Sequence, residues 1–304
     1  MKKTCLALLP LLLLAGCQTR EPYVASPSRS DRVFPGRDIG MAWDAQGGLH
    51  AIHVEDAAGG ARVVYRRLDK LGFKAVTVSP PGVKTNAGGE TPPVLQILAD
   101  GALVAAYSVP SPGQGSGRIL AQRSTDGGAT WSAPKPPPNG GDPGSPQQRG
   151  PRLAQAGDGS LWTVWFTGEP PGGVYAAASR DGGATFGPRQ PVVTLGGDVH
   201  NAMHPEIGVL PDGRIAVLYE AFRDLGVHQV EARLRTPSGS WSGLAVVEPD
   251  AGSPRLASRG KRAVVAFTRR RGESSEILVR DWERVFPPAA ARPSARTAPV
   301  PGQG

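Results

Sequence analysis

The sequence predicts an all-β fold, a β-propeller of four-stranded antiparallel blades, and three observations support this prediction. First, an apolar stretch, a Gly-containing turn and a second apolar stretch recur about every 53 residues. Such a turn between two apolar runs is a strong hairpin signal, because Gly accepts a positive φ with little strain. Second, 41 Gly and 31 Pro among 304 residues disfavour helices. Third, 39% apolar residues and six Trp argue against a disordered chain.

Five turn glycines define the period, and each unit then adds a second hairpin. Five blades are therefore expected, at about 38–80, 92–137, 150–195, 203–248 and 253–288. Residues 18–36 and 289–304 are short and rich in Pro, so whether five or six blades close the propeller stays open. The turn glycines are Gly47, Gly101, Gly159, Gly213 and Gly260, at spacings of 54, 58, 54 and 47 residues.

Two motifs of eight residues, beginning at Ser124 and Ser179, share the pattern Ser-x-Asp-x-Gly-x-Thr-Trp/Phe at a spacing of 55 residues. They resemble the Asp box of bacterial neuraminidase repeats, which occurs in sialidase-like β-propellers. The resemblance implies that the boxes lie on the face opposite the active site. We expect the Asp carboxylates to lock turns and the aromatic rings to be buried between strands. The structural residues are then Asp126, Trp131, Asp181 and Phe186.

The first residues predict an export signal. Lys2 and Lys3 precede an apolar run from Cys5 to Leu14, which is shorter than the about 20 residues that a membrane span needs. The following Leu-Ala-Gly-Cys resembles the lipobox of bacterial lipoproteins, which implies a lipid on Cys17; Gln18 then favours the outer membrane. The expected domains are a signal peptide (1–16), an anchor and linker (17–37), the propeller (38–288) and a disordered Pro-rich tail (289–304).

Composition narrows the classes of partner and cofactor. Cys5 and Cys17 are the two cysteines, so the mature chain is expected to hold no disulfide. The net charge of +8 comes mostly from scattered Arg, which disfavours nucleic acid. The stretch His200–Glu206 looks metal-like, but His-x3-His suits a helix, and here a loop enters a strand. We therefore expect no metal and no cofactor, and a monomer whose partners are the membrane, a glycan or an envelope protein.

The resemblance to sialidases implies a set of candidate catalytic residues. In that family three arginines bind a carboxylate, a Tyr assisted by a Glu is the nucleophile, and an Asp is the acid/base. Arg37 has the spacing of the first arginine, ten residues before Gly47, although the Ile-Pro that follows it in the family is missing. Asp56 is the candidate acid/base. Glu206 is the candidate for the family Glu, although it lies two residues after His204, which occupies the position that the family spacing predicts.

Other residues are candidate ligand-binding groups. Arg152 and Arg255 enter first strands directly after Pro, as Glu206 does, and are expected to project toward the axis. His204 occupies the spacing of the family Glu and shares a side of the strand with Glu206. Glu220 stands where the second arginine is expected, and no residue matches the nucleophilic Tyr; Tyr219 is the nearest.

Two functions remain open from the sequence. The first is a lipid-anchored envelope propeller that binds a glycan or an envelope partner without turnover. The alternative is an exo-glycosidase acting on terminal sugars, for which two carboxylates are sufficient. Turnover of an aryl glycoside discriminates between the two functions, since fold alone does not specify activity.

Overall fold

A computed structural model describes residues 34–286, except 70–73, 86–90, 111–116, 137–147, 169–171, 236–238, 240 and 273. The chain divides into two units, Met1–Phe34 and Pro35–Gly304, and the strands belong to the second. Cys17, the predicted signal peptide and the predicted tail lie outside the described residues. Among the residues that are described, no helix has both the length and the apolar character needed to cross a membrane.

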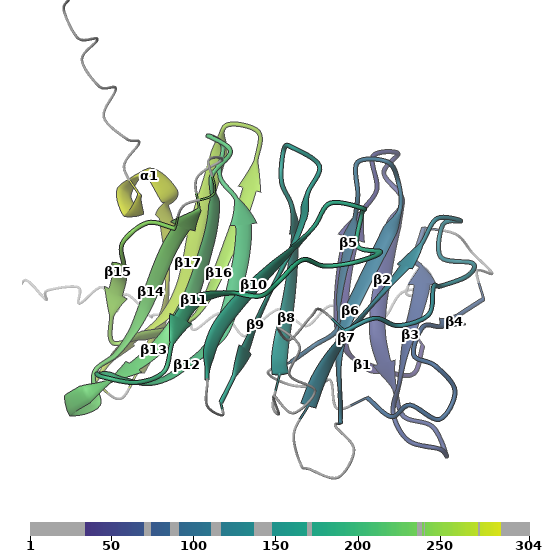
Figure 1. Ribbon diagram of the computed structural model, residues 1–304, viewed down its shortest axis with the longest axis horizontal. Helices are drawn as coiled ribbons and strands as arrows, with labels where there is room; N and C mark the ends of the chain where they lie inside the picture. The colour runs from purple at the N-terminus through teal and green to yellow at the C-terminus, as the bar shows by residue number, and fades with distance from the viewer. Residues whose placement is uncertain are drawn as a thin grey trace, which may run out of the picture. The chain divides into compact units, whose positions relative to one another are not determined.

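The second unit consists of five antiparallel sheets, called blades 1 to 5, whose strands follow one another in chain order (Figure 1). Blade 1 contains β1 (Arg37–Trp43), β2 (Leu49–Glu55), β3 (Arg62–Arg67) and β4 (Val76–Thr77). Blade 2 contains β5 (Val94–Ile97), β6 (Leu103–Pro110) and β7 (Gly117–Ser124). Blade 3 contains β8 (Gln148–Gln155), β9 (Leu161–Thr167), β10 (Gly173–Ser179) and β11 (Gln190–Thr194).

Blade 4 contains β12 (Val199–Val209), β13 (Ile215–Arg223), β14 (His228–Arg235) and β15 (Ala245–Pro249), with the 3-10 helix η1 (Asp224–Gly226) between β13 and β14. Blade 5 contains β16 (Ala251–Arg259), β17 (Arg262–Arg271) and β18 (Ser274–Asp281), followed by the one-turn helix α1 (Trp282–Val285). The predicted all-β class and the five blades are thus confirmed. Four strands were expected in every blade, but within the described residues the sheets of blades 2 and 5 contain three strands each.

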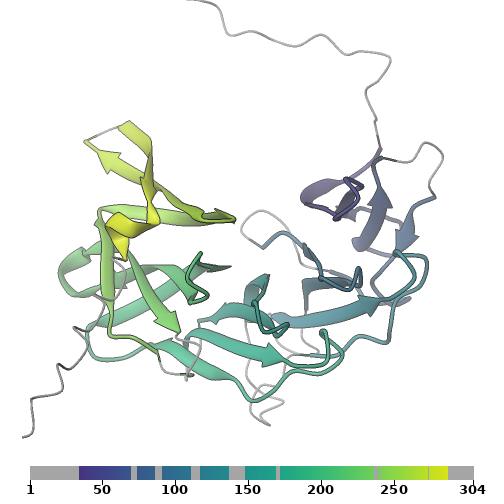
Figure 2. The same cartoon turned by 90° about the horizontal axis from the view of Figure 1, so that it is seen from above.

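Successive blades pack through their first strands. β1 contacts β5, β5 contacts β8, β8 contacts β12, and β12 contacts β16 (Figure 2). Apolar side chains fill the space between each pair of neighbouring blades, so the core is divided into four clusters rather than one. Burial of this kind contributes about 25 cal/mol per Å² of apolar surface. Each hydrophobic face is covered by the next blade.

Both Asp boxes form closed turns. The Asp126 carboxylate accepts hydrogen bonds from the Thr130 backbone N–H (2.9 Å), the Thr130 hydroxyl (2.5 Å) and the Ser124 hydroxyl (2.8 Å). Asp181 receives the same three bonds from Thr185 and Ser179. Hydrogen bonds from Thr130, and then from Ser124, lower the pKa of Asp126 to about 2. These contacts are those of a turn held by its own carboxylate.

The aromatic residue of each box packs into an interblade cluster. Phe186 is buried with the side chains between blades 2 and 3. Trp131 is partly buried against the cluster between blades 1 and 2, where its ring meets Tyr65 edge to face at 5.6 Å. The Tyr65 hydroxyl in turn donates to the Gly127 carbonyl in the box of blade 2 (3.0 Å). Each box therefore joins its own turn to a neighbouring blade.

Candidate functional site

A β-bulge recurs at one end of the first strand in four blades. In β12, His204 and Pro205 together oppose Tyr219, because Met203 pairs with Glu220 and Glu206 pairs with Leu218. The same shift occurs in β1, β8 and β16. A bulge bends its strand and redirects the side chains beside it, which is why bulges are frequent next to active sites. The first bulge residue has a positive φ in each: Asp38 (53°), Gly150 (62°), His204 (49°) and Ser253 (52°).

The residue after the bulge is charged in three successive blades. Arg152 follows the bulge in blade 3, Glu206 follows it in blade 4, and Arg255 follows it in blade 5. Proline occupies the second bulge position in all three strands, where a missing backbone N–H is tolerated because the bulge interrupts the ladder. The repeat of the fold therefore places Arg, Glu and Arg at equivalent positions.

These three side chains meet. Glu206 Oε2 lies 3.5 Å from Arg152 Nε and 4.0 Å from a terminal nitrogen of Arg255. Each arginine also donates to the carbonyl of the proline before it, Pro151 at 2.9 Å and Pro254 at 2.8 Å. Arg152 and Glu206 are each 13% exposed at the side chain, whereas Arg255 is 57% exposed. The site thus has a buried ion pair and one guanidinium open to solvent.

Burial controls the protonation of this pair. Removal from water raises the pKa of Glu206 above its usual range, although Arg152 and Arg255 act in the opposite direction. Burial likewise lowers the pKa of Arg152, and the Glu206 carboxylate opposes that change. The carboxyl group of Glu206, with its pKa raised, therefore lies beside an exposed cation.

Glu220 is a second buried carboxylate, and it has the opposite character. It accepts hydrogen bonds from His204 Nδ1 (2.7 Å), His228 Nε2 (2.6 Å) and the Ser253 backbone N–H (3.0 Å). Burial alone would raise its pKa, but these donors lower the pKa to about 2. A Cβ at position 252 would lie 2.7 Å from the Glu220 carboxyl carbon, so Gly252 makes room for it. Glu220 is ionised throughout the neutral range.

The two carboxylates share one face of blade 4. Glu206 on β12 is paired with Leu218 on β13, and paired residues point to the same side of the sheet. Leu218 and Glu220 are two residues apart on β13, so Glu220 points to that side as well and is a diagonal neighbour of Glu206. Diagonal neighbours of this kind have Cα atoms about 7–8 Å apart. Both side chains contact blade 5, Glu206 at Arg255 and Glu220 at Ser253. Two carboxyl groups whose pKa values are shifted in opposite directions therefore lie side by side.

Arg37 and Asp56 form a separate cluster in blade 1. The guanidinium of Arg37 lies 2.6 Å from Asp38 and 3.4 Å from Asp56, and all three side chains are at least partly exposed. Asp38 is the first bulge residue of β1, so this cluster lies at the same end of its blade as His204 does in blade 4. The hydrogen bonds to Asp38 and then Asp56 raise the pKa of Arg37.

The structure thus brings four of the sequence candidates into two neighbouring contacts. Arg152 and Arg255 lie beside Glu206, and His204 donates to Glu220. Sequence reasoning missed Glu220 as a functional residue. Its signal was a lone acidic residue within the apolar stretch Ile215–Phe222, because a charge in a buried strand needs partners. Tyr219 points the other way and is fully buried in the cluster between blades 3 and 4. Its position is that of a core residue.

The remaining histidines do not build a metal centre. His200 pairs with Asp224 at the surface, and both are well exposed. His50 bonds to Asp44 (3.0 Å) and to the Tyr65 hydroxyl (2.7 Å). Across the described part of the chain, no group of three or more His, Cys, Asp or Glu side chains is arranged to hold a metal ion.

Comparison with known proteins shows the fold. No protein-family model and no curated protein sequence matches the chain. Among solved structures, a GH93 α-L-arabinofuranosidase of Fusarium graminearum is 15% identical, with a TM-score of 0.56. An α-L-arabinanase of Penicillium chrysogenum is 18% identical, with a TM-score of 0.55. Each of these matches covers 83% of this chain and 79% of the other.

A Hadza microbial sialidase is also similar, with 15% identity and a TM-score of 0.48. That match covers 77% of this chain, and the chain spans 56% of the length of the sialidase. The order of strands in the blades, the Asp boxes and the two structural matches above a TM-score of 0.5 all indicate the same fold. The chain therefore has the fold of the sialidase-like β-propellers.

Proposed function

We propose that this protein is a glycoside hydrolase that removes terminal sugars. The observation that carries this proposal is the pair of carboxylates on blade 4, with the pKa of Glu206 raised and that of Glu220 lowered to about 2. Neighbouring carboxyl groups with opposite pKa shifts supply the acid and the base of glycoside cleavage. Structures with the same fold include an arabinofuranosidase and an arabinanase.

In the proposed reaction, Glu206 donates its proton to the glycosidic oxygen as the bond to the anomeric carbon breaks. Glu220, which is ionised, either accepts a proton from the attacking water or attacks the anomeric carbon itself. In the second case it forms a glycosyl ester, and water that gives its proton to Glu206 then breaks the bond between Glu220 and the sugar. Water is consumed, and Glu206 recovers its proton at the end of the cycle. The exposed guanidinium of Arg255 faces the substrate and is suited to a carboxylate on the sugar, because its planar fork can bind both oxygens.

Turnover of fluorogenic aryl glycosides by the full-length protein in detergent tests this proposal. A sialoside, an α-L-arabinofuranoside and a glucuronide form the first panel. We expect Glu206→Gln and Glu220→Gln each to lower kcat at least 100-fold, which is the usual contribution of a general acid or base. Asp100→Asn, at an exposed hairpin turn of blade 2, is the matched control and leaves kcat unchanged. Hydrolysis that survives both substitutions on blade 4 would overturn the assignment.

The pH profile gives an independent check. Activity requires Glu206 protonated, so kcat/KM falls as pH rises through its raised pKa. It also requires Glu220 ionised, so the acid limb lies near pH 2, below the usual range for Glu. We expect a plateau between these limits. An acid limb near pH 4.5 would show that Glu220 is not the ionised partner.

Glycan binding without turnover is the second candidate. Three donors already occupy the Glu220 carboxylate, and two arginines lie beside Glu206, an arrangement that also suits a fixed recognition site. Under this alternative, glycan arrays give saturable binding that Arg255→Gln weakens, and no aryl glycoside is cleaved. The turnover panel therefore separates the two functions.

We also propose that Cys17 carries a lipid that anchors the protein to the outer membrane. Support comes from the sequence alone, from Leu14-Ala15-Gly16-Cys17 and the residue Gln18. Metabolic labelling with a fatty-acid analogue should mark the wild-type chain and not Cys17→Ala. Label that persists in the variant would contradict the anchor.

A further inference from the structure

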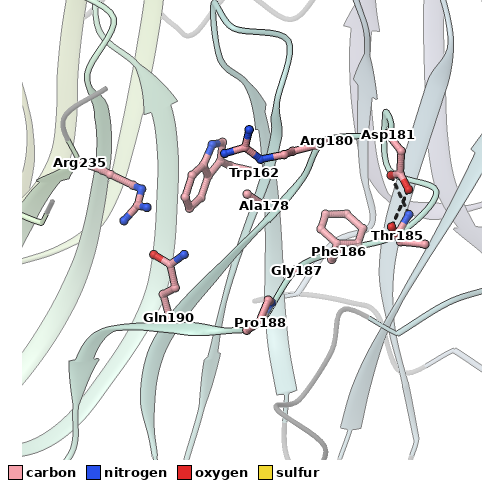
Figure 3. A pocket seen from close by; sticks show the side chains of 10 residues that line it. All are labelled: Trp162, Ala178, Arg180, Asp181, Thr185, Phe186, Gly187, Pro188, Gln190 and Arg235. Carbon is pink, nitrogen blue, oxygen red and sulfur yellow. Dashed lines mark hydrogen bonds between the residues drawn. The ribbon is translucent and has the colours of Figure 1, made fainter. Parts of the chain in front are cut away.

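A pocket with a volume of about 470 Å³ lies beside the Asp box of blade 3. Blade 3 supplies Trp162 from β9, Arg180 and Asp181 from the box, and Gln190 from β11, while blade 4 supplies Arg235 from β14. Figure 3 shows these side chains around one opening. The pocket shares no lining residue with the cluster around Glu206 and Glu220, so its chemistry is independent of the proposed hydrolase.

Arg235 is held in place by aromatic rings. Its guanidinium lies 4.8 Å from the ring centre of Trp162 and 5.4 Å from that of Trp241. The two indoles meet edge to face at 6.4 Å, and Trp162 Nε1 donates to the Ser160 hydroxyl at 3.0 Å. Contact with a ring face stabilises a cation and restricts its motion. The Arg235 side chain is therefore fixed before any ligand arrives.

The pocket has an excess of positive charge, because Arg180 and Arg235 line it together with one acidic residue, Asp181. In the described ranges, no carboxylate oxygen lies within 4.0 Å of the guanidinium of Arg180 or Arg235, whereas the partly buried Arg66, Arg223 and Arg269 are each paired with a glutamate. Asp181 also lines the pocket, but its carboxylate accepts two hydrogen bonds from Thr185 (Figure 3) and one from the Ser179 hydroxyl. Burial also lowers the pKa of Arg235.

The size and the lining of the pocket narrow the ligand. A simple inorganic anion would fill only a small part of the volume, which is sufficient for one or two sugar rings. Gln190 offers both a donor and an acceptor, as hydroxyl groups require. Phe186 and the Trp162 edge give an apolar wall. We propose that this pocket binds an acidic sugar, with the sugar carboxylate between Arg180 and Arg235 and the ring hydroxyls toward Gln190.

Isothermal titration of the full-length protein with D-glucuronate, D-glucose and inorganic phosphate tests this site. We expect saturable binding of glucuronate and none of glucose. Arg180→Gln and Arg235→Gln should each weaken glucuronate at least tenfold, because each removes a charge-assisted hydrogen-bond donor. Arg118→Gln, an exposed arginine of β7, is the matched control and leaves the affinity unchanged. Arg180 is itself exposed, so its substitution tests the site even if Arg235→Gln disturbs packing on Trp162.

Three results would overturn the proposal. One is glucuronate affinity that neither Arg180→Gln nor Arg235→Gln changes. Another is affinity lost in Arg255→Gln and kept in Arg180→Gln, which would place the sugar at the site around Glu206. The third is phosphate bound as tightly as glucuronate, which would show an anion site that does not recognise sugars. Failure of the hydrolase assay leaves this test unaffected, since it measures binding at other residues.

Discussion

Two glutamates of one blade show how strongly the surroundings decide the behaviour of a single residue. Glu206 lies among desolvated groups, and its pKa is raised even though two arginines are close. Glu220 is also desolvated, but it accepts bonds from His204, His228 and a backbone N–H, and its pKa falls to about 2. The difference arises because hydrogen bonds to the charged form outweigh burial in one case only.

Glycines of the Asp box allow a matched test at the residue scale. Gly127 and Gly128 both have positive φ, 70° and 90°. A Cβ at Gly127 meets nothing within 4 Å, whereas a Cβ at Gly128 would lie 2.0 Å from the Tyr65 ring. Gly127→Ala should therefore lower the free energy of unfolding by about 1 kcal/mol, from backbone strain alone. Gly128→Ala should lower it by about 3 kcal/mol, because overpacking adds to the strain. Urea titrations that give equal losses would contradict the contact between box and blade 1.

At the scale of the element, the repeated β-bulge positions the charged residues of the candidate site at the ends of the first strands. Each bulge forces one residue into the left-handed region, a conformation that favours Gly. Blade 3 uses Gly150 there, but blade 4 uses His204 and blade 5 uses Ser253. In its strained conformation, His204 forms a hydrogen bond to Glu220, which offsets part of the cost of the positive φ. Strain of this kind persists where the neighbouring groups fix the conformation.

Exchange of the bulge residues tests this interpretation. Ser253 donates its hydrogen bond to Glu220 from the backbone N–H, which glycine keeps. Ser253→Gly should therefore be neutral or raise the free energy of unfolding by up to about 1 kcal/mol. Gly150→Ser should lower it, because a Cβ there would be 3.0 Å from the Phe166 ring. Thermal melts of the two variants should move in different directions. A marked loss in Ser253→Gly would show that its side chain matters.

On the scale of the whole molecule, each blade is stabilised by its neighbours. The four clusters between blades bury both faces of the internal sheets, while the first and last sheets each have one face that no other blade covers among the described residues. Their apolar residues on that side are correspondingly exposed. They are Ile39, Met41 and Trp43 in β1, and Ile277 and Val279 in β18.

Acid stability is a property of all the blades together. Each of blades 1 to 4 contains a carboxylate whose pKa is lowered to about 2: Asp69, Asp126, Asp181 and Glu220. A pKa below its unfolded value, near 4, adds stability above that value and loses it as pH falls toward 2. Urea midpoints should therefore be similar at pH 7 and pH 5 and fall steeply between pH 4.5 and pH 2.5.

Glu220→Gln is the control for this prediction. It should unfold more readily than the wild type at pH 7, by roughly 2–3 kcal/mol, and the difference should shrink near pH 2 as Glu220 itself becomes protonated. The contribution of Glu206 to stability changes with pH in the opposite direction. Because its pKa is raised in the folded state, that contribution is lost as pH increases through this pKa. A midpoint that stays constant down to pH 2.5 would contradict the lowered pKa values.

Local patterns determined the all-β class, the five blades and the turn chemistry. A hairpin turn, an Asp box and an alternating strand are set by residues within about ten positions, so the sequence contains all the information they need. The Pro before Arg152, Glu206 and Arg255 also indicated that these residues enter the first strands of their blades in the same way. Arg152 and Arg255 were expected near the axis, and the structure brings both to Glu206.

Only the tertiary structure decided which charges meet and which remain unpaired. Glu220 became a candidate because a bulge brings His204 to it, and strand register brings His228 and Ser253. The pocket at Arg235 exists because β14 of blade 4 passes beside the Asp box of blade 3. Burial and electrostatic contacts depend on distances between segments that are far apart in the chain, and those distances are fixed by packing between blades.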